Sequence, residues 1–399
     1  MRISAKFILP LLLLCSCAKD RTYEYEEKTQ GNHWMESAMQ EWYLWGDSLK
    51  PLEWRQYFAT PATFVSRLTA QSKANDSWSF CSVDTVQTDN YPIGQVNRTN
   101  TYGMDYVLMT DPTGSTTRQY ARVITVFPGS PAMRCGLQRG DFIAQVGDEK
   151  ITRNVTSRLN KGLERKLVVN RLGVDNTATE ILWATVDTLY MEASEPITIP
   201  AVMNCSMLTD DVAYIMLTSL ADYTAIGPSL SQLLANSPAD LILDLRLCNY
   251  GTMDCVVSVA NQIATASGPF LRTVWNDKKS HYNATYNINA STGIHLFFIT
   301  SSYTRGAAEW LIYGLQSLQP SNVRVVGKST AGQYVMLQAV PSAYYYTIYP
   351  AVAYVCNAEG ECDYQSGITP DDVLDDFNYV QLFPYGDPRE VLVDFILDN

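Results

Sequence analysis

The spacing of the hydrophobic residues changes twice along the chain. Residues 34–74 repeat aromatic and apolar side chains at helical spacing, and Pro51 and Pro61 divide this stretch into short helices. Residues 91–190 alternate in the manner of β-strands. From about residue 194 onwards, short apolar runs typical of buried strands alternate with amphipathic segments typical of helices. The pattern therefore predicts a helical domain, a β domain and an α/β domain, in that order.

The length and the apolar content of the chain agree with three folded domains. Its 399 residues exceed a common domain size of about 100 to 200 residues, and its 46% of hydrophobic residues is ample for several packed cores. The α/β region carries the clearest pattern. Its expected strands lie at residues 212–217, 241–246, 295–300 and 323–326, and its expected helices at residues 225–235, 253–266 and 304–318.

The first 17 residues predict export from the cytoplasm. Arg2 and Lys6 give a positive start, and residues 7–14 form an apolar run too short to span a bilayer, so we expect a signal peptide. The run ends in Leu14-Cys15-Ser16-Cys17, which resembles a bacterial lipobox. Cys17 would then be lipidated and would anchor the protein in the bacterial cell envelope. The alternative is an ordinary secretory signal that is cleaved elsewhere.

The residues after Cys17 indicate in which membrane the protein is anchored and how it is attached. Ala18 is not the Asp that retains many lipoproteins in the inner membrane, so we expect the outer membrane, with the protein facing the periplasm or the cell surface. Residues 18–31 are polar and charged and are predicted to be a tether. The full division is a signal peptide at residues 1–17, this tether, a helical domain at residues 32–90, a β domain at residues 91–190 and an α/β domain at residues 191–399.

The charge and the histidines argue against several classes of function. The formal net charge of −12, without a basic patch, disfavours nucleic-acid binding. The three histidines are scattered along the sequence, and no Cys/His spacing resembles a zinc site. Neither a metal nor another cofactor is therefore expected.

The cysteines allow a disulfide. Seven remain after Cys15 and Cys17, and an odd number cannot all pair within the chain. Cys356 and Cys362 flank a turn-like segment between apolar strands, so a hairpin disulfide is expected in an oxidising compartment. Two unpaired thiols are the alternative.

Residues 122–143 carry a specific motif of the β domain. Ser130-Pro131 supplies a helix cap and a proline at the first helical position, Gly136 can end that short helix, and Gly140-Asp141 turns into the next strand. This segment resembles a PDZ domain of the bacterial protease type. The resemblance implies that an extended peptide adds to a strand edge by β-augmentation. Separately, the charge of Arg98 makes it a candidate partner for the terminal carboxylate of such a peptide. A PDZ domain that has lost its ligand is the alternative. The peptide-binding residues implied are Tyr102, Gly103, Met104, Asp105 and Tyr106.

Two segments of the α/β domain carry its candidate chemistry. The first is Thr304-Arg305-Gly306-Ala307-Ala308-Glu309, and the second is Gly327-Lys328-Ser329-Thr330-Ala331-Gly332-Gln333. They resemble the nucleophile turn and the later base-bearing segment of the C-terminal processing peptidases, also called tail-specific proteases. Residues 243–246, 367–371 and 386–392 extend the resemblance, which covers nearly everything after the tether. It implies a small N-terminal helical domain, a PDZ domain and a crotonase-like or ClpP-like α/β core, with a Ser/Lys dyad acting on polypeptides.

Both residues of that dyad are missing at the matching positions. Gly306 stands where the family has its serine, and it has no side chain to attack with. Gln333 stands where the family has its lysine base, and it cannot ionise. The resemblance places the oxyanion region at Tyr250, Gly251 and Ala307, where Tyr250 fills a glycine position and makes the geometry of the backbone donors doubtful.

Neighbouring side chains offer displaced candidates. Ser302 lies just before the expected helix, and Lys328 begins the loop that leads to Gln333. Cys248 replaces a family Asn and fits a buried small residue better than a nucleophile. We therefore expect a lipid-anchored, peptide-binding protein without catalysis. An active serine endopeptidase using displaced residues is the alternative, and a component of an uptake or surface assembly, in which the fold is only architecture, is a third possibility.

Overall fold

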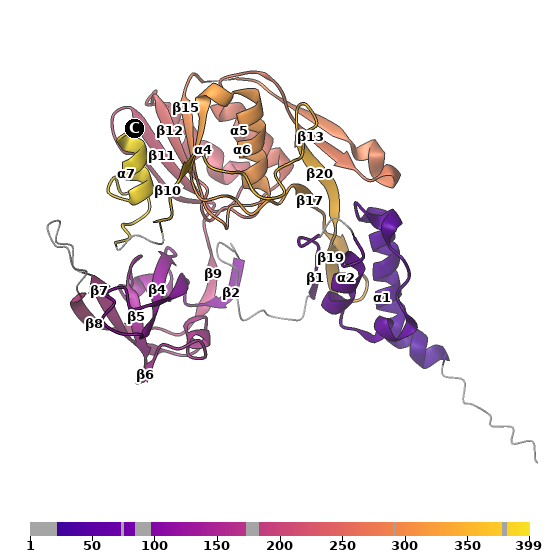
Figure 1. Cartoon of the computed structure of the whole chain (residues 1–399), viewed down its shortest axis with the longest axis horizontal. Coiled ribbons are helices and arrows are strands. Elements are labelled where there is room, and N and C mark those ends of the chain that lie inside the picture. The colour runs from indigo at the N-terminus through magenta and orange to yellow at the C-terminus, as the bar shows by residue number, and fades with distance from the viewer. Residues whose placement is uncertain (1–21, 73–75, 84–96, 173–182, 291, 377–380) are drawn as a thin grey trace, which may run out of the picture.

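A computed structural model shows how the three domains are arranged (Figure 1). It describes residues 22–72, 76–83, 97–172, 183–290, 292–376 and 381–399. The predicted signal peptide and the predicted lipidation site, Cys17, lie outside the described residues. A helical domain and a β domain lie next to each other on one side of a larger α/β core. The fold class predicted from the hydrophobic pattern is thus confirmed.

The helical domain packs two α-helices around an aromatic core. Thr60 caps the second helix, because its side chain accepts a hydrogen bond from the Thr63 backbone N–H, and Pro61 occupies the first turn. Met39, Tyr43 and Phe64 are fully buried between the helices. The elements are α1 (Thr22–Trp42), the 3₁₀ helices η1 (Gly46–Ser48) and η2 (Trp54–Phe58), and α2 (Pro61–Thr69).

The first helix begins earlier than the sequence pattern suggests. α1 starts at Thr22, within the stretch 18–31 that was expected to be a tether. Tertiary contacts account for the difference: Thr29 is buried, and the Tyr25 ring lies 5.5 Å from the Phe58 ring, centroid to centroid. A polar segment is therefore held as helix by partners that lie elsewhere in the chain.

The β domain is an antiparallel sheet in the strand order β3-β4-β5-β7-β8. Ser130 Oγ accepts from the Met133 backbone N–H at 3.1 Å and so caps the short helix α3, and Gly136 follows that helix with φ +85°. The elements are β3 (Met104–Thr110), β4 (Gln119–Val126), α3 (Pro131–Arg134), β5 (Phe142–Val146), β6 (Glu149–Lys150), η3 (Thr156–Leu159), β7 (Arg165–Leu172) and β8 (Trp183–Met191). A separate ribbon of β2 (Asn97–Thr101) and β9 (Glu195–Thr198) leads to the core.

The α/β core has a six-stranded sheet in the order β10-β11-β12-β15-β16-β21. Only β10 runs antiparallel to its neighbour, as the register of the ladder shows. The helices α4, α5 and α6 bury one face of the sheet, and α7 packs on the other. The bounds are β10 (Val202–Met207), β11 (Val212–Leu217), α4 (Tyr223–Leu234), β12 (Asp240–Asp244), α5 (Met253–Ile263), β15 (His295–Thr300), α6 (Ala307–Leu318), η5 (Pro320–Asn322), β16 (Val323–Gly327), β21 (Asp372–Val373) and α7 (Val391–Leu397).

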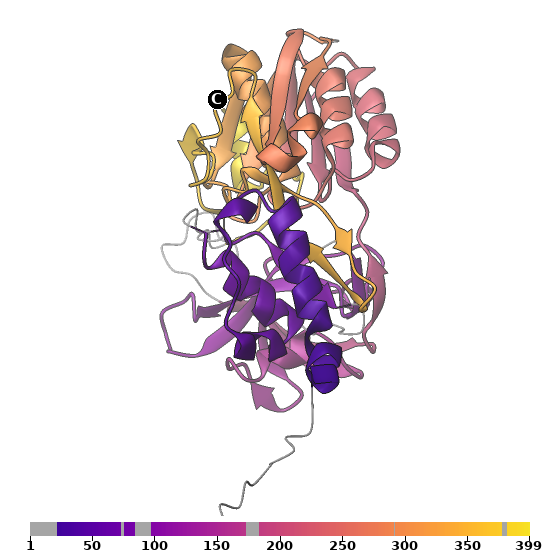
Figure 2. The ribbon, with the colours of Figure 1, turned by 90° about the vertical axis from the view of Figure 1, so that its right-hand side faces the viewer.

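Two further sheets extend the core towards the helical domain: a four-stranded sheet in the order β14-β13-β20-β17 and a three-stranded sheet in the order β1-β19-β18. β19 pairs with β1 of the helical domain, and the buried side chains of the two domains form one cluster. Figure 2 shows α1 lying alongside this extension. The elements are β1 (Phe80–Val83), β13 (Gly268–Trp275), η4 (Asp277–Tyr282), β14 (Ala284–Ile288), β17 (Val335–Leu337), β18 (Val340–Pro341), β19 (Tyr346–Tyr349) and β20 (Ala351–Asn357). Within the described ranges, no helix is both long enough and apolar enough to cross a bilayer.

Candidate active site

The nucleophile position and the base position face each other. Gly306 precedes α6 with φ +61° and ψ −119°, a conformation that glycine adopts freely. A Cβ added to Gly306 would lie 3.3 Å from Gln333 Nε2 and 3.4 Å from Gln333 Oε1. A side chain at residue 306 would thus point at the side chain of residue 333. The fold keeps the juxtaposition that a nucleophile and its base require, without either group.

The Glu309 carboxylate accepts hydrogen bonds from the segment of Gly306 and from that of Gln333, and so holds the two segments together. One carboxylate oxygen, Oε2, accepts from the backbone N–H groups of Gly306 at 2.9 Å and Gln333 at 2.7 Å. The other, Oε1, accepts from Thr330 Oγ1 and from the Gly332 backbone N–H, each at 2.5 Å. Burial raises the pKa of Glu309, although these four hydrogen bonds oppose the rise. The bond to Gly306 is a local cap at the start of α6, whereas the bonds from residues 330–333 join a separate segment to it.

The expected oxyanion residues also lie together. A Cβ on Gly251 would lie 2.5 Å from Ala307 Cβ and 2.6 Å from the Leu220 backbone oxygen, so the two backbones approach closely. Tyr250 is 57% exposed and its backbone oxygen accepts from Leu220 N–H at 2.8 Å. Ser237 and Tyr345 are the non-glycine residues with positive φ in the described part of the chain, so Tyr250 fits without left-handed strain. The position that requires glycine is Gly251.

Cys248 is part of the packed core. Its side chain is fully buried among apolar neighbours, and its backbone oxygen accepts from Arg305 N–H at 3.2 Å. Burial raises the pKa of the thiol well above its ordinary value. A thiol that stays protonated is a poor nucleophile. The structure thus supports the structural role expected for Cys248.

The displaced candidates do not meet. Ser302 is exposed in the turn before α6, and the Lys328 ammonium lies 2.7 Å from Asp375 Oδ2 in an ion pair. No hydrogen bond joins Ser302 to Lys328. The neighbouring hydroxyls have structural partners: Ser301 Oγ donates to the Arg246 backbone oxygen at 2.7 Å, and Thr304 Oγ1 donates to the Leu245 backbone oxygen at 2.9 Å.

Arg305 was not singled out from the sequence. It lies directly before Gly306 and is half-buried, and its side chain has no hydrogen bond or ion pair within the described ranges. Burial lowers the pKa of its guanidinium, and the charge of Glu309 opposes that shift. A half-buried cation beside the nucleophile position offers donors to a carboxylate or to peptide carbonyl oxygens. Only its burial, which the sequence does not reveal, draws attention to it.

The predicted peptide-binding residues of the PDZ-like domain lie at a sheet edge. β3 forms one edge of its sheet in the described structure, as β-augmentation requires. Tyr102 is buried, with its hydroxyl donating to the Leu163 backbone oxygen, and a Cβ on Gly103 would clash with Ser130. Tyr106 Oη lies 2.8 Å from both the Thr156 backbone oxygen and Asn160 Oδ1, so this side chain bridges β3 and η3. Met104 is buried beside it.

Arg98 does not face the position expected of it. Its guanidinium is buried and forms a bidentate ion pair with Asp105, at 2.8 and 3.0 Å. It also lies over the Phe127 ring, 4.6 Å from the centroid. A guanidinium that already pairs with a buried carboxylate is a poor partner for a ligand's carboxylate. The expected role of Arg98 is corrected on this ground.

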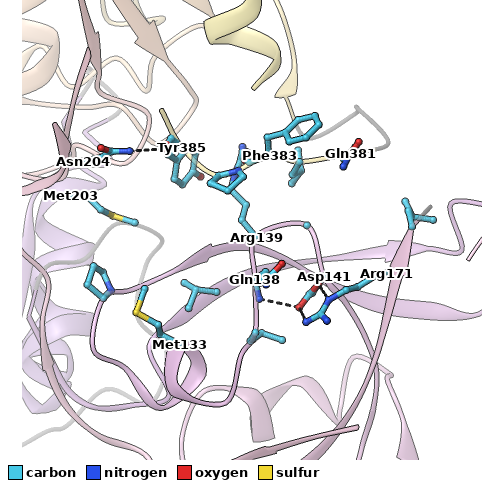
Figure 3. A pocket seen from close by; sticks show the side chains of 17 residues that line it. Met133, Gln138, Arg139, Asp141, Arg171, Met203, Asn204, Gln381, Phe383 and Tyr385 are labelled. Atoms are coloured by element: carbon cyan, nitrogen blue, oxygen red, sulfur yellow. Dashed lines mark hydrogen bonds and ion pairs between the residues drawn. The ribbon is translucent and has the colours of Figure 1, made fainter. Parts of the chain in front are cut away.

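The β domain meets the core across a cluster of buried charges. Arg139 of the β domain and Arg246 of the core share Asp376 Oδ2, at 2.9 and 2.8 Å, and Arg246 also contacts Glu390 Oε1 at 2.7 Å. The Tyr385 ring lies under both guanidinium groups, 4.1 and 4.7 Å from its centroid. A cavity of about 470 Å³ opens beside this cluster (Figure 3), with Met133 and Met203 among its apolar walls. None of these charges was proposed from sequence as part of a site.

Family models match three parts of the chain in the predicted order. Residues 211–374 match the model described as peptidase family S41, residues 30–80 match the peptidase S41 N-terminal domain, and residues 122–159 match a PDZ domain. No curated protein sequence matches the chain.

Solved structures show the same architecture. A Bacteroides fragilis protein assigned to the S41 proteases is 24% identical with a TM-score of 0.80, and the match covers 92% of this chain and 96% of that one. The photosystem II D1 C-terminal processing protease is 17% identical with a TM-score of 0.51, covering 92% of this chain and 97% of that one. At these identities the likeness shows a shared fold.

Proposed function

Because the chain belongs to peptidase family S41 but carries Gly306 and Gln333 at the dyad positions, we propose that it binds peptides without hydrolysing them. One observation carries the proposal. A Cβ at residue 306 would lie 3.3 Å from the Gln333 side chain, so the two positions are in register for catalysis and both reactive groups are absent. The Gln333 amide cannot accept a proton as an amine base does, so it could not activate a nucleophile. Gly306 also has no hydroxyl that could be activated.

The surroundings of the site support retained peptide binding. Glu309 keeps the turn and the loop at residues 330–333 together, and Gly251 still packs against Ala307. The half-buried Arg305 offers donors to a peptide carboxylate or carbonyl. The edge strand β3 provides a second surface to which an extended chain could add. A polypeptide, and in particular its C-terminal segment, is the ligand class that fits.

We place this activity in the bacterial cell envelope. The proposal rests on the sequence of residues 1–17, which predicts export and lipidation at Cys17. The start of α1 at Thr22 would hold the helical domain close to the membrane surface. Outer-membrane attachment, facing either the periplasm or the cell surface, is the expected location. Labelling of the protein by a radioactive fatty acid, and loss of the label in Cys17→Ser, tests it.

A cleavage and binding assay tests the main proposal. The protein from residue 18 onwards, which contains every described residue, is incubated with unfolded casein beside the Gly306→Ser/Gln333→Lys double variant. We expect the native protein to bind casein and leave it intact, and the double variant to gain measurable cleavage. Binding without turnover separates this function from proteolysis, whereas failure to bind any unfolded polypeptide would favour a purely architectural role.

If the protein is instead an active serine endopeptidase, the same assay should give a different result. Cleavage by the native protein that disappears in Ser302→Ala or Lys328→Ala would establish displaced catalytic groups. The ion pair of Lys328 with Asp375 and the exposed position of Ser302 argue against this outcome. Asp375→Asn serves as a control, because it releases Lys328 without removing it.

A further inference from the structure

We propose that a pocket beside the base position binds a lysine or arginine side chain of the peptide ligand. The inference rests on the proposed function and names the substrate class of that same site. The pocket has a volume of about 850 Å³ and includes Ala331 and Tyr334, which flank Gly332 and Gln333 on the loop that Glu309 holds. A peptide that passes the Gly306–Gln333 pair therefore has this pocket within reach of a neighbouring residue.

Aromatic rings form one part of the pocket. Tyr334 and Tyr354 stack with their centroids 5.7 Å apart and their planes 28° apart, and Trp78 lies in the same lining. Trp45 Nε1 donates to the Tyr354 hydroxyl at 3.0 Å, which holds that ring in place. Aromatic faces carry partial negative charge and attract ammonium and guanidinium groups.

Two carboxylates form the other part. Glu361 and Asp363 both line the pocket and are exposed. Each uses one oxygen within the protein: Glu361 Oε2 accepts from Asn357 Nδ2 at 2.8 Å, and Asp363 Oδ1 accepts from Tyr313 Oη at 2.6 Å. Neither forms an ion pair in the described structure, and the lining contains no lysine or arginine.

A disulfide restrains the segment that carries the two carboxylates. The disulfide between Cys356 and Cys362 ties the segment that carries Glu361 and Asp363 to the buried end of β20, and Cys362 itself lines the pocket. The two carboxylates share the pocket with aromatic rings and have no ion pair there among the described residues. They would repel an acidic side chain of a ligand, and they would lose hydration if an apolar side chain of a ligand lay beside them. A long cationic side chain, with an apolar stem for the rings and a charged end for the carboxylates, fits both parts.

Binding of two small probes to the protein from residue 18 onwards tests the inference. The probes are N-acetyl-lysine methylamide and N-acetyl-norleucine methylamide, which differ only in the charged end, and binding is followed by ligand-observed NMR. We expect the lysine probe to bind about three- to tenfold more tightly at low salt, since exposed ion pairs and cation–π contacts are each weak. The preference should shrink at 500 mM NaCl because salt screens exposed charges.

Variants assign the preference to this pocket. Glu361→Gln/Asp363→Asn keeps both hydrogen-bond acceptors and should abolish the preference, and Tyr334→Leu should weaken it independently. Glu359→Gln is the matched control, because Glu359 is an exposed carboxylate on the same turn but lies outside the pocket lining. Equal binding of the two probes, or a preference that survives the double variant, would overturn the inference. Casein binding, measured separately, decides the proposed function, so the two ideas can fail independently.

Discussion

Gly306 shows how much one residue decides. Its φ of +61° and ψ of −119° would strain any residue with a Cβ, and such strain is typical of nucleophile turns that carry catalytic groups. With glycine the strain is absent, yet the turn persists because Glu309 accepts a hydrogen bond from its N–H. Hydrogen bonding thus holds the turn in this conformation with no side chain at residue 306.

Restoring a serine at this position should cost stability. We expect Gly306→Ser to lower the free energy of unfolding by about 1–3 kcal/mol, because a residue with a Cβ is strained in this backbone conformation. The added Cβ would also lie 3.3 Å from Gln333 Nε2. Urea denaturation of the native protein and the variant measures the difference. Gly293→Ser is the control, since Gly293 has no positive φ and a Cβ there meets nothing within 4 Å. Equal stability of the two variants would show that the turn is not strained.

Among the elements, the hairpin after β20 connects the site to its surroundings. β20 is buried along most of its length, and the disulfide from Cys356 to Cys362 returns the chain to it within six residues. The hydrogen bonds of Asn357 with Glu361 reinforce the same turn. The segment that follows lines the pocket beside Tyr334.

Loss of this cross-link should loosen the hairpin without unfolding the protein. We expect Cys362→Ser to lower the free energy of unfolding by about 2 kcal/mol, because a short disulfide loop restricts the unfolded chain only modestly. Thermal unfolding with and without reductant checks this, and the native protein in reductant should resemble the variant. Cys205→Ser, which removes a cysteine outside this disulfide, should leave the response to reductant unchanged. A native protein indifferent to reductant would contradict the role given to the disulfide.

At the scale of the whole molecule, buried charges join the PDZ domain to the core. Arg139 comes from one domain and Arg246, Asp376 and Glu390 from the other, and all four side chains are buried. Burial raises the pKa of Glu390, but the two arginines outweigh it and hold the pKa below its ordinary value of 4.5. Asp244 also pairs with Arg246, at 2.6 Å. Removing one member of the cluster would leave the remaining buried charges with fewer partners, which costs more than an exposed ion pair contributes.

The stability contributed by Glu390 should depend on pH in a defined direction. A carboxylate with a lowered pKa stabilises the folded state above its ordinary pKa of 4.5, and this stabilisation is lost as the pH falls through the lower folded value. We expect Glu390→Gln to cost about 3–5 kcal/mol at pH 7 and progressively less below about pH 4.5. Urea unfolding at pH 7 and pH 4 measures this. A cost that stays constant, or that matches the exposed control Glu53→Gln, would contradict it.

The sequence by itself determined the order of the domains and the family, and it led to the prediction that the dyad is missing. Apolar periodicity placed β11 at residues 212–217 and β15 at residues 295–300, because buried strands leave a strong local pattern. Gly306 and Gln333 could be singled out because they stand inside motifs that resemble those of the family.

Only the tertiary structure decided which groups meet. Four hydrogen bonds converge on Glu309, Arg98 turns out to pair with Asp105, and Tyr334 comes beside Glu361. Three of the four bonds to Glu309 come from residues 330–333, a separate segment, and Tyr334 and Glu361 of the pocket also lie on separate segments. The Arg98 pair is closer in sequence but depends on burial that the sequence pattern does not show. Local periodicity reports which face of an element is buried, whereas the partners of buried polar groups depend on packing between distant elements.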